Sequence, residues 1–267
     1  MSRPTARLLA LGTVLALLWP GAAAALEYQG AGRGTPRPAY PGGGGIAAAA
    51  RFLDGRAGRT AFAVVDDKGR LSGLRLHLRF NSASVVKAML LVAYLERLAD
   101  AGRGLDPASR SLLYPMIHVS DNNAASAVFG IVGDAGLRRV AGQVGMTDFA
   151  TSGRWWGFTQ ISAADQARFF VVQDHLIPPQ FDGYARGLLS GISADQSWGV
   201  PAVGRPRFRV FFKGGWLPSE GLVNQAARLE GRGATFAIAV LTTGGPSMGY
   251  GEQTIEGVAA RVLGNGA

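Results

Sequence analysis

The sequence contains no cysteine, and 24 of its 27 basic residues are arginine. Without cysteine the chain can form no disulfide, bind no metal through a thiolate and carry no lipid on an N-terminal cysteine. The three histidines, His77, His118 and His175, share no spacing that is typical of metal ligands. We therefore expect no metal and no organic cofactor, and we interpret the histidines as packing or surface residues.

Several catalytic and binding motifs are also absent. The sequence has no G-x-S-x-G and no H-E-x-x-H, which leaves a Ser-His-Asp site and a zinc protease site without support. The net charge of +9 comes from arginines that are scattered rather than clustered, so nucleic acid is not an expected partner. A basic exterior suits an anionic surface or substrate, but the charge by itself does not choose between them.

The first residues are typical of an export signal. Arg3 and Arg7 precede an apolar run from Leu8 to Trp19, and alanines follow up to Ala25. Because this run is shorter than the roughly 20 residues that span a bilayer, we expect a cleaved signal peptide over residues 1–25 and no stable membrane span. The alternative is a retained anchor. The expected location is the secreted, periplasmic or cell-wall space.

Composition divides the rest of the chain into a leader and a domain. Residues 26–45 are rich in proline and glycine and read as a flexible leader, followed by a folded domain over residues 46–267. Apolar periodicity predicts helices over 46–53, 85–98, 107–118, 124–132, 136–144, 162–172, 181–189 and 253–262. It predicts strands over 60–65, 71–78, 208–212, 222–229 and 234–241.

This order of elements predicts an α/β fold of the α+β type. Two early and three late strands would form a five-stranded, mainly antiparallel sheet flanked by the terminal helices. The helices between residues 84 and about 201 would form an inserted all-helical lobe. Binding sites tend to lie between such lobes, so residues at their junctions are the strongest candidates for function.

Ser84 and Lys87 form the first candidate pair. They lie three residues apart at an expected helix start, which places the hydroxyl and the amine on one face. A serine hydroxyl becomes a good nucleophile when a neighbouring base takes its proton, and a lysine can do this if its pKa is lowered. Taken by itself, the pair also fits an ordinary helix-capping serine and a surface lysine.

Two further segments strengthen the functional interpretation. Ser120-Asp121-Asn122 is expected in a tight turn between helices, although Ser and Asp are also routine helix caps. Lys213-Gly214-Gly215 ends an expected strand, where glycine lets a ligand approach the backbone. Since the chain has only three lysines and otherwise uses arginine, Lys87 and Lys213 indicate sites where an amine is specifically needed.

The three segments, in this order, resemble the S-x-x-K, S-D-N and K-T-G signature of class A β-lactamases and penicillin-binding D,D-peptidases. The resemblance extends from about Ile46 to Val262 and implies a β-lactamase/transpeptidase-like fold. It also implies that Ser84 attacks a lactam or peptide carbonyl while Lys87 accepts the proton. Ser120 would return a proton to the leaving nitrogen.

The same resemblance assigns the residues that bind the substrate. Asn122 would orient Lys87 and the substrate amide, while Lys213 would supply positive potential and lower the pKa of Lys87 through like charge. The oxyanion hole would use the backbone N–H groups of Ser84 and Trp216. Gly215 would belong to the same substrate-binding strand.

Three differences from this family limit what the resemblance implies. Gly214 stands where the family has a hydroxyl that helps to hold the substrate carboxylate. The stretch from Ser84 to Ser120 is shorter than is usual for β-lactamases. No glutamate occurs between Glu96 and Glu220, where a class A enzyme has its water-activating glutamate.

Two nearby features are weaker candidates. Asp165 is the obvious acid to replace the missing glutamate, but Ser162-Ala163-Ala164-Asp165 reads as a helix cap. The aromatic segment 155–158 is interpreted as core or cleft lining rather than as a sugar-binding platform.

We therefore expect a secreted, monomeric serine hydrolase that forms an acyl-enzyme at Ser84 with a small β-lactam or a D-Ala-D-Ala-like cell-wall peptide. The first alternative is an esterase or amidase with another acyl substrate, which Gly214 and the missing glutamate favour. The second is a non-catalytic cell-wall binding protein that keeps the fold.

Overall fold

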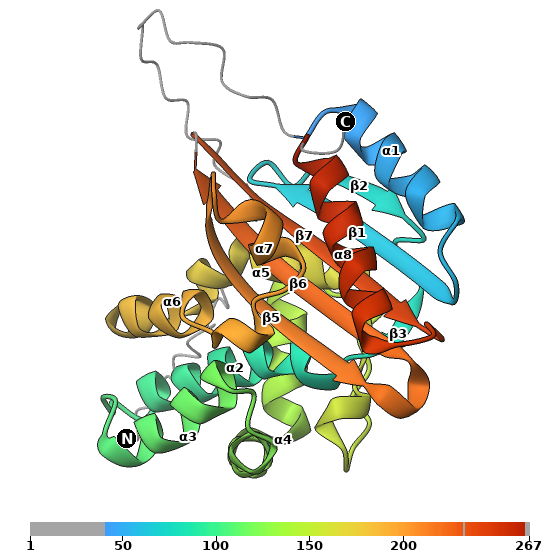
Figure 1. Cartoon of the computed structure of the whole chain (residues 1–267). Helices are drawn as coiled ribbons and strands as arrows, with labels where there is room; N and C mark the ends of the chain where they lie inside the picture. Colours follow the sequence, from blue (N-terminus) through green and yellow to red (C-terminus); the bar gives the residue numbers. More distant parts are fainter. Residues whose placement is uncertain (1–40, 232, 265–267) are drawn as a thin grey trace, which may run out of the picture. The chain divides into compact units, whose positions relative to one another are not determined.

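A five-stranded antiparallel sheet forms the centre of the computed structural model, which describes residues 41–231 and 233–264 (Figure 1). The strand order is β2-β1-β7-β6-β5. The strands are β1 Arg59–Asp66, β2 Leu71–Leu74, β5 Arg209–Leu217, β6 Leu222–Gly231 and β7 Ala234–Thr243. The predicted sheet is therefore confirmed. The predicted signal peptide and most of the leader lie outside the described residues.

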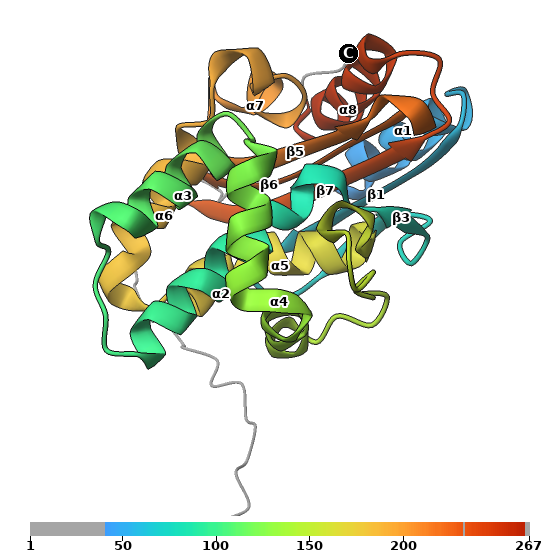
Figure 2. The ribbon, with the colours of Figure 1, turned by 90° about the horizontal axis from the view of Figure 1, so that it is seen from below.

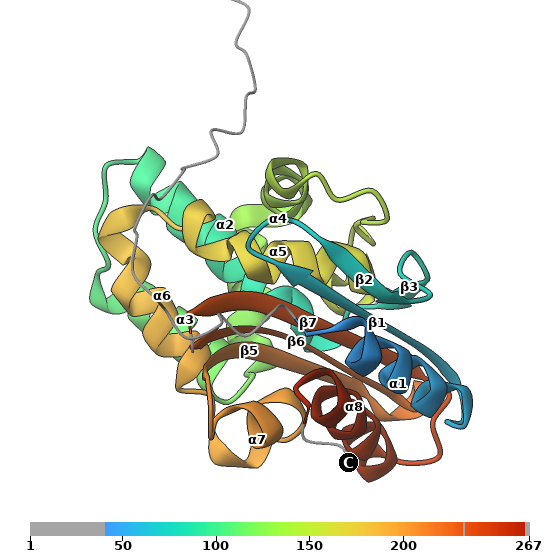
Figure 3. The same cartoon turned by 90° about the horizontal axis from the view of Figure 1, so that it is seen from above.

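Helices cover both faces of the sheet. Helices α1 (Gly43–Asp54) and α8 (Met248–Val262) pack on one face, and α5 (Ala163–Leu176) packs on the other against β1, β6 and β7 (Figure 3). Because both faces are covered, the central strands are buried along nearly their whole length rather than at alternate residues.

The two ends of the domain meet in the sheet. Strand β1 pairs with β7, with Phe62 opposite Val240, and α1 packs against α8. This pairing joins segments about 180 residues apart, so the chain between them must leave the sheet and return to it.

The intervening chain forms the helical side of the molecule (Figure 2). Its helices are α2 Lys87–Asp100, α3 Pro107–His118, α4 Asn122–Val144 and α6 Asp182–Ser190, whereas the short helix α7 Val200–Gly204 packs beside α8 (Figure 3). The predicted caps are present: the Asp106 carboxylate accepts a hydrogen bond from Ser109 N at 2.7 Å, and the Ser162 hydroxyl accepts one from Asp165 N at 3.2 Å.

Several predicted boundaries were wrong. Helix α1 begins at Gly43, inside the predicted leader, and β2 ends at Leu74 rather than at residue 78. Strand β5 continues to Leu217 instead of ending before Lys213, because β6 pairs with it along its whole length. The two helices predicted over 124–144 form one element, interrupted at Gly133, where φ is 61° and ψ is −174°.

The sequence patterns also missed a short strand pair. Strands β3 (Arg79–Asn81) and β4 (Gln160–Ser162) are only three residues each, too short for a period to be recognised. Among the described residues, no helix combines the length and the apolar character needed to cross a bilayer.

Candidate active site

The candidate site residues converge from three parts of the fold. Ser84 lies in a 3₁₀ turn, Ala83–Val86, between β3 and α2, while Ser120 and Asn122 lie where α3 passes into α4. Lys213 comes from the middle of β5. Ser84, Ser120 and Asn122 line a pocket of about 140 Å³, together with Ala83, Trp156, Gly157, Trp216 and Leu217. Its walls therefore come from both the sheet and the helical side.

Lys87 is fully buried beneath this pocket as the first residue of α2. Its Nζ donates to the backbone oxygen of Ser120 at 2.5 Å, to Asn122 Oδ1 at 2.8 Å and to Ser120 Oγ at 3.1 Å. These three acceptors match the three N–H bonds of an ammonium group. A neutral amine has one N–H fewer and a free lone pair, so loss of a proton creates a base at this position.

Lys213 reaches the same hydroxyl from the sheet. It is also fully buried, and its Nζ donates to Ser120 Oγ at 3.0 Å and to the backbone oxygen of Gly214 at 3.0 Å. The Ser120 hydroxyl thus lies between two amines. It has one proton to donate and can accept from the other amine, so it is placed to pass a proton.

Burial governs the charge of both lysines. It lowers the pKa of Lys87 from 10.5 to about 7, although the nearby Asp121 carboxylate partly opposes the shift. Burial, and secondly the charge of Lys87, hold the pKa of Lys213 well below 10.5. Desolvation is the main cause at both lysines, and the like-charge repulsion between the two amines adds to it.

Ser84 is half-buried at the edge of the pocket. In the described part of the chain, no hydrogen bond joins its hydroxyl to the Lys87 amine. Unliganded active sites often hold such contacts loosely, so this geometry leaves the pair available for proton transfer on substrate binding. The preceding residue, Ala83, has φ of 45°, an unusual and strained conformation for a residue other than glycine.

The strand β5 fixes the backbone of this turn by close approach. A Cβ atom on Gly215 would lie 2.5 Å from Ser84 N, 2.8 Å from Val85 N and 3.0 Å from Ser82 O. Only glycine fits at this distance, because all three neighbouring atoms are backbone. The sequence predicted that these glycines let a ligand approach the backbone; at Gly215 the group that approaches is the backbone of the Ser84 turn.

A polar network that the sequence did not reveal anchors the start of the same turn. Asn81 Nδ2 donates to both Glu220 carboxylate oxygens at 3.0 Å, and Asn81 Oδ1 accepts from Gln160 Nε2 at 2.5 Å. The buried Asn224 side chain donates to the backbone oxygen of Asn81 at 2.9 Å. These residues come from four separate segments, so no local motif could have indicated the network.

The aromatic segment 155–158 contributes to the pocket in part. Trp156 lines it, with its ring centroid 4.8 Å from Lys87 Nζ and its Nε1 donating to Ser126 Oγ at 3.2 Å. Trp155 and Phe158 are instead among the exposed large side chains. The prediction of cleft lining therefore holds for Trp156 only.

Gly214 is covered by a neighbouring ring. A Cβ atom there would lie 3.0 Å from the Trp198 indole, which also packs edge-on against Trp216. The buried Gln225 side chain donates to the Trp198 backbone oxygen at 2.9 Å and accepts from Val200 N at 2.7 Å, so this turn is held firmly. Gly214 therefore lacks the hydroxyl of the K-T-G signature, and the Trp198 ring covers the same position.

Asp165 lies outside the pocket. Its carboxylate is buried and accepts hydrogen bonds from Thr147 N at 3.2 Å and Asp148 N at 2.8 Å, so it holds the chain after α4. The helix-cap interpretation of this segment is confirmed.

The histidines also lie elsewhere. His77 pairs with Asp148, and His118 stacks on Tyr114. No cluster of three or more potential metal ligands occurs among residues 41–231 and 233–264.

The sequence of the chain matches one known protein family. A model described as the beta-lactamase enzyme family matches residues 101–265, more than half of the chain. The chain belongs to the beta-lactamase enzyme family. This membership agrees with the resemblance seen in the sequence and makes the protein a serine hydrolase of β-lactamase type. A search of the curated proteins found no match to the sequence.

Solved structures of class A β-lactamases share the fold of this family member at low sequence identity. The β-lactamase from Sphaerobacter thermophilus is 22% identical, with a TM-score of 0.71 over 83% of this chain and 96% of the other. A class A enzyme from Bacteroides cellulosilyticus is 16% identical, with a TM-score of 0.73 over 83% and 96%. A variant of the last common ancestor of Gram-negative bacteria class A β-lactamase is 21% identical, with a TM-score of 0.71 over 83% of this chain and 97% of the other.

The two buried lysines can be tested directly, because the chain contains only three lysines. With lysine labelled by ¹³C at Cε, we expect three NMR resonances, of which the one from Lys87 titrates near pH 7 because burial disfavours its charge. Lys87→Arg and Lys213→Arg assign the signals. A Lys87 resonance that stays protonated up to pH 10 would contradict the burial argument.

Proposed function

We propose that this protein is an acyl-transfer hydrolase that forms an acyl-enzyme at Ser84 with a β-lactam or a D-Ala-D-Ala-like amide. One observation carries the proposal: the Ser120 hydroxyl lies 3.1 Å from Lys87 Nζ and 3.0 Å from Lys213 Nζ, and both amines are buried. Ser120 lines the same pocket as Ser84, so the arrangement supplies buried amines that can act as a base there and a proton route toward a leaving group.

The chemistry follows from these positions. Neutral Lys87 takes the proton of the Ser84 hydroxyl as Oγ bonds to the substrate carbonyl carbon, and the carbonyl oxygen becomes an oxyanion. The backbone N–H groups of Ser84 and Trp216 would stabilise that oxyanion. When the C–N bond breaks, the Ser120 hydroxyl gives its proton to the leaving nitrogen and is reprotonated by the Lys87 ammonium.

Substrate-binding roles follow the same geometry. Asn122 Oδ1 holds the Lys87 amine at 2.8 Å, which leaves its side-chain NH₂ for the substrate amide. Lys213, when protonated, provides positive potential beside Gly215 and the pocket. All these residues come from one chain, so we propose that the protein acts as a monomer.

A second candidate is an esterase or amidase that acts on an acyl substrate without the carboxylate of a β-lactam. The Trp198 ring over Gly214 favours it, because an aromatic wall replaces the hydroxyl that would hold a carboxylate. In this second candidate function Ser84 is still the nucleophile, but the substrate lacks the carboxylate of a β-lactam. A non-catalytic cell-wall binding role is the remaining alternative.

Acylation is tested with a fluorescent penicillin and intact-mass measurement. Ser84→Ala should abolish the adduct, and Lys87→Arg should slow its formation by about 100- to 10,000-fold, because a guanidinium keeps the charge but cannot accept the proton. In the wild type the rate should rise through pH 7, as Lys87 loses its proton.

The controls are Ser111→Ala and Lys68→Arg, which make the same chemical changes on the exposed surface and should leave labelling unchanged. Labelling of Lys87→Arg at the wild-type rate would show that the base is misassigned. Reaction with p-nitrophenyl esters but not with penicillin would favour the second candidate, and reaction with neither would favour the binding role.

Deacylation is expected to be slow. In the described structure no Asp or Glu lines the Ser84 pocket, so the acyl-enzyme has no carboxylate base for water. Since such a base is typically worth about 100- to 10,000-fold in rate, a chromogenic cephalosporin should give a burst of about one equivalent followed by slow turnover. Sustained turnover of hundreds per second would contradict this expectation.

We also propose that the protein is exported from the cytoplasm after cleavage of a signal peptide. The charged, apolar and small-residue segments at the start favour a mature chain that begins near Ala25 or Leu26, in the secreted, periplasmic or cell-wall space. N-terminal sequencing of protein recovered outside the cytoplasm should find that end. Recovery of the intact Met1 chain in the membrane fraction would instead favour the retained anchor.

A further inference from the structure

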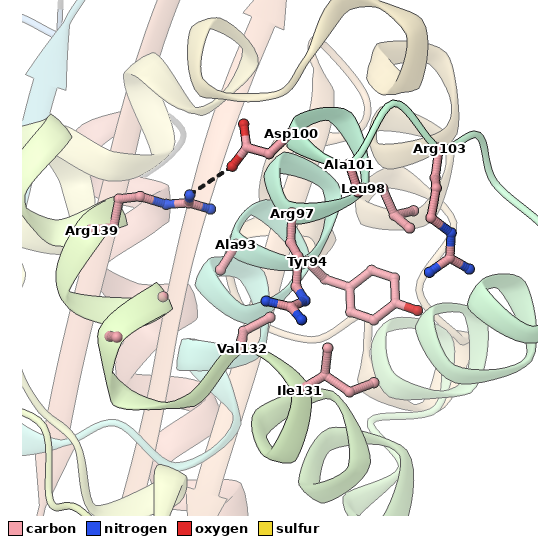
Figure 4. Close-up of a pocket in the computed structure, with 12 residues that line it drawn as sticks. Ala93, Tyr94, Arg97, Leu98, Asp100, Ala101, Arg103, Ile131, Val132 and Arg139 are labelled. Carbon is pink, nitrogen blue, oxygen red and sulfur yellow. Dashed lines mark hydrogen bonds and ion pairs between the residues drawn. The ribbon is translucent and has the colours of Figure 1, made fainter.

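A second cavity lies between helices α2 and α4, away from the chemistry. It has a volume of about 520 Å³ and shares no lining residue with the Ser84 pocket (Figure 4). Small-molecule sites typically have volumes of about 300–1,000 Å³, so the cavity is large enough for a ligand. Its lining residues come from the last turns of α2, the loop that follows and the middle of α4.

One part of the cavity wall is apolar. Ala93 and Leu98 contribute from α2, and Ile131, Val132 and Ala135 contribute from α4. Ile131 is 40% exposed, which makes it one of the few large apolar side chains of the described residues that face solvent. The break in α4 at Gly133 falls among these residues, so the wall is formed by two helical segments rather than by one straight helix.

The other part of the wall is cationic. Arg139 pairs with Glu96 at 3.0 Å and with Asp100 at 2.9 Å, and Arg103 pairs with the carboxylate that caps α3. Asp100 lies three residues after Arg97 on α2 and would be its natural partner, but Arg139 has taken it. Across the described residues, Arg97 has neither an ion pair nor a hydrogen bond to a side chain. In Figure 4 its guanidinium points between Tyr94 and Val132.

We propose that this cavity binds a single-chain anionic amphiphile, that is, a carboxylate or phosphate head on a linear apolar tail. Arg97 would bind the head, because its guanidinium offers a planar pair of donors that no side chain of the described residues accepts from. The tail would lie along Leu98, Ile131 and Val132, where it removes exposed apolar surface from water. The ligand could be a free amphiphile in solution or a lipid in a membrane, since the recognised chemistry is the same.

The charge arrangement disfavours other ligand classes. A cationic amphiphile would meet an unpaired guanidinium, while the acids of the rim already have partners. A small polar anion would leave the apolar wall exposed to water and gain only the ion pair. Both features of the site are therefore needed for tight binding.

Calorimetric titration of the full protein with sodium decanoate, below its micelle concentration, tests the proposal. We expect one molecule bound per chain, and no comparable binding of butyrate or of decyltrimethylammonium. Flotation with neutral vesicles and with vesicles containing an anionic phospholipid separates the two sources. Decanoate binding without flotation identifies a free amphiphile, whereas flotation with anionic vesicles that Arg97→Gln weakens more than Arg51→Gln does identifies a membrane lipid.

Two variants assign the site. Arg97→Gln should weaken decanoate binding by about 10- to 100-fold, as expected for a charge-assisted hydrogen bond. Ala135→Trp, at an exposed helix position, should block the cavity with little effect on folding. Arg51→Gln is the matched control, because it removes the same charge from an exposed position on α1.

The proposal fails if decanoate does not bind, or if decyltrimethylammonium binds as tightly. It also fails if Arg97→Gln binds decanoate no more weakly than Arg51→Gln does, or if Ala135→Trp leaves binding intact. None of these measurements depends on acylation at Ser84, so they test the cavity independently of the proposed reaction.

Discussion

Two buried amines that share one hydroxyl are the constraint on which the rest of this structure depends. Lys87 and Lys213 are both fully buried, and the Ser120 hydroxyl lies between them. Removing a cation from water costs about several kcal/mol even after the protein relaxes, so the fold has to compensate for two of them. It does so by supplying oxygen acceptors and by lowering the pKa values, so that both amines need not be charged at once.

That compensation has a consequence for stability. Because the pKa of Lys87 is about 7 in the folded protein and 10.5 as its ordinary value, the unfolded chain binds more protons between these two pH values. The contribution of Lys87 to the free energy of unfolding therefore rises with pH across that window and is lowest below pH 7. The residue costs stability and provides a base at neutral pH, which is typical of groups in functional sites.

The nucleophile turn shows how the sheet and the helical side are joined. Gly215 brings β5 against the backbone of Ser84, and Asn81 ties the start of the turn to Glu220 and Gln160. The strained φ of Ala83 lies between these two anchors. Strain of this kind persists only where the surroundings over-determine it, so the placement of Ser84 is a property of the whole junction rather than of its helix.

Membership of the beta-lactamase family and the differences from its signature bear on different steps of the reaction. In the proposed reaction, Ser84, the two lysines and the Ser120–Asn122 turn would carry acylation, and these residues lie together. In the same proposal, the missing glutamate would affect deacylation and the aromatic cover of Gly214 would affect the choice of substrate. Asp165 is buried and bonded to the chain after α4, so it does not take the place of that glutamate.

The sequence by itself determined the sheet, most of the helices and the convergence of Ser84, Lys87, Ser120, Asn122 and Lys213, because strong periodicity and short motifs are local signals. It did not determine where β5 ends, since pairing with β6 extends that strand through two glycines. Tertiary structure alone decided the Asn81 network, the position of Trp198 over Gly214 and the cavity at Arg97. Each depends on contacts between segments that are far apart in the sequence, as when Arg139 pairs with Asp100 and Arg97 has no side-chain partner among the described residues. Tertiary packing decides these contacts, and no local sequence pattern predicts them.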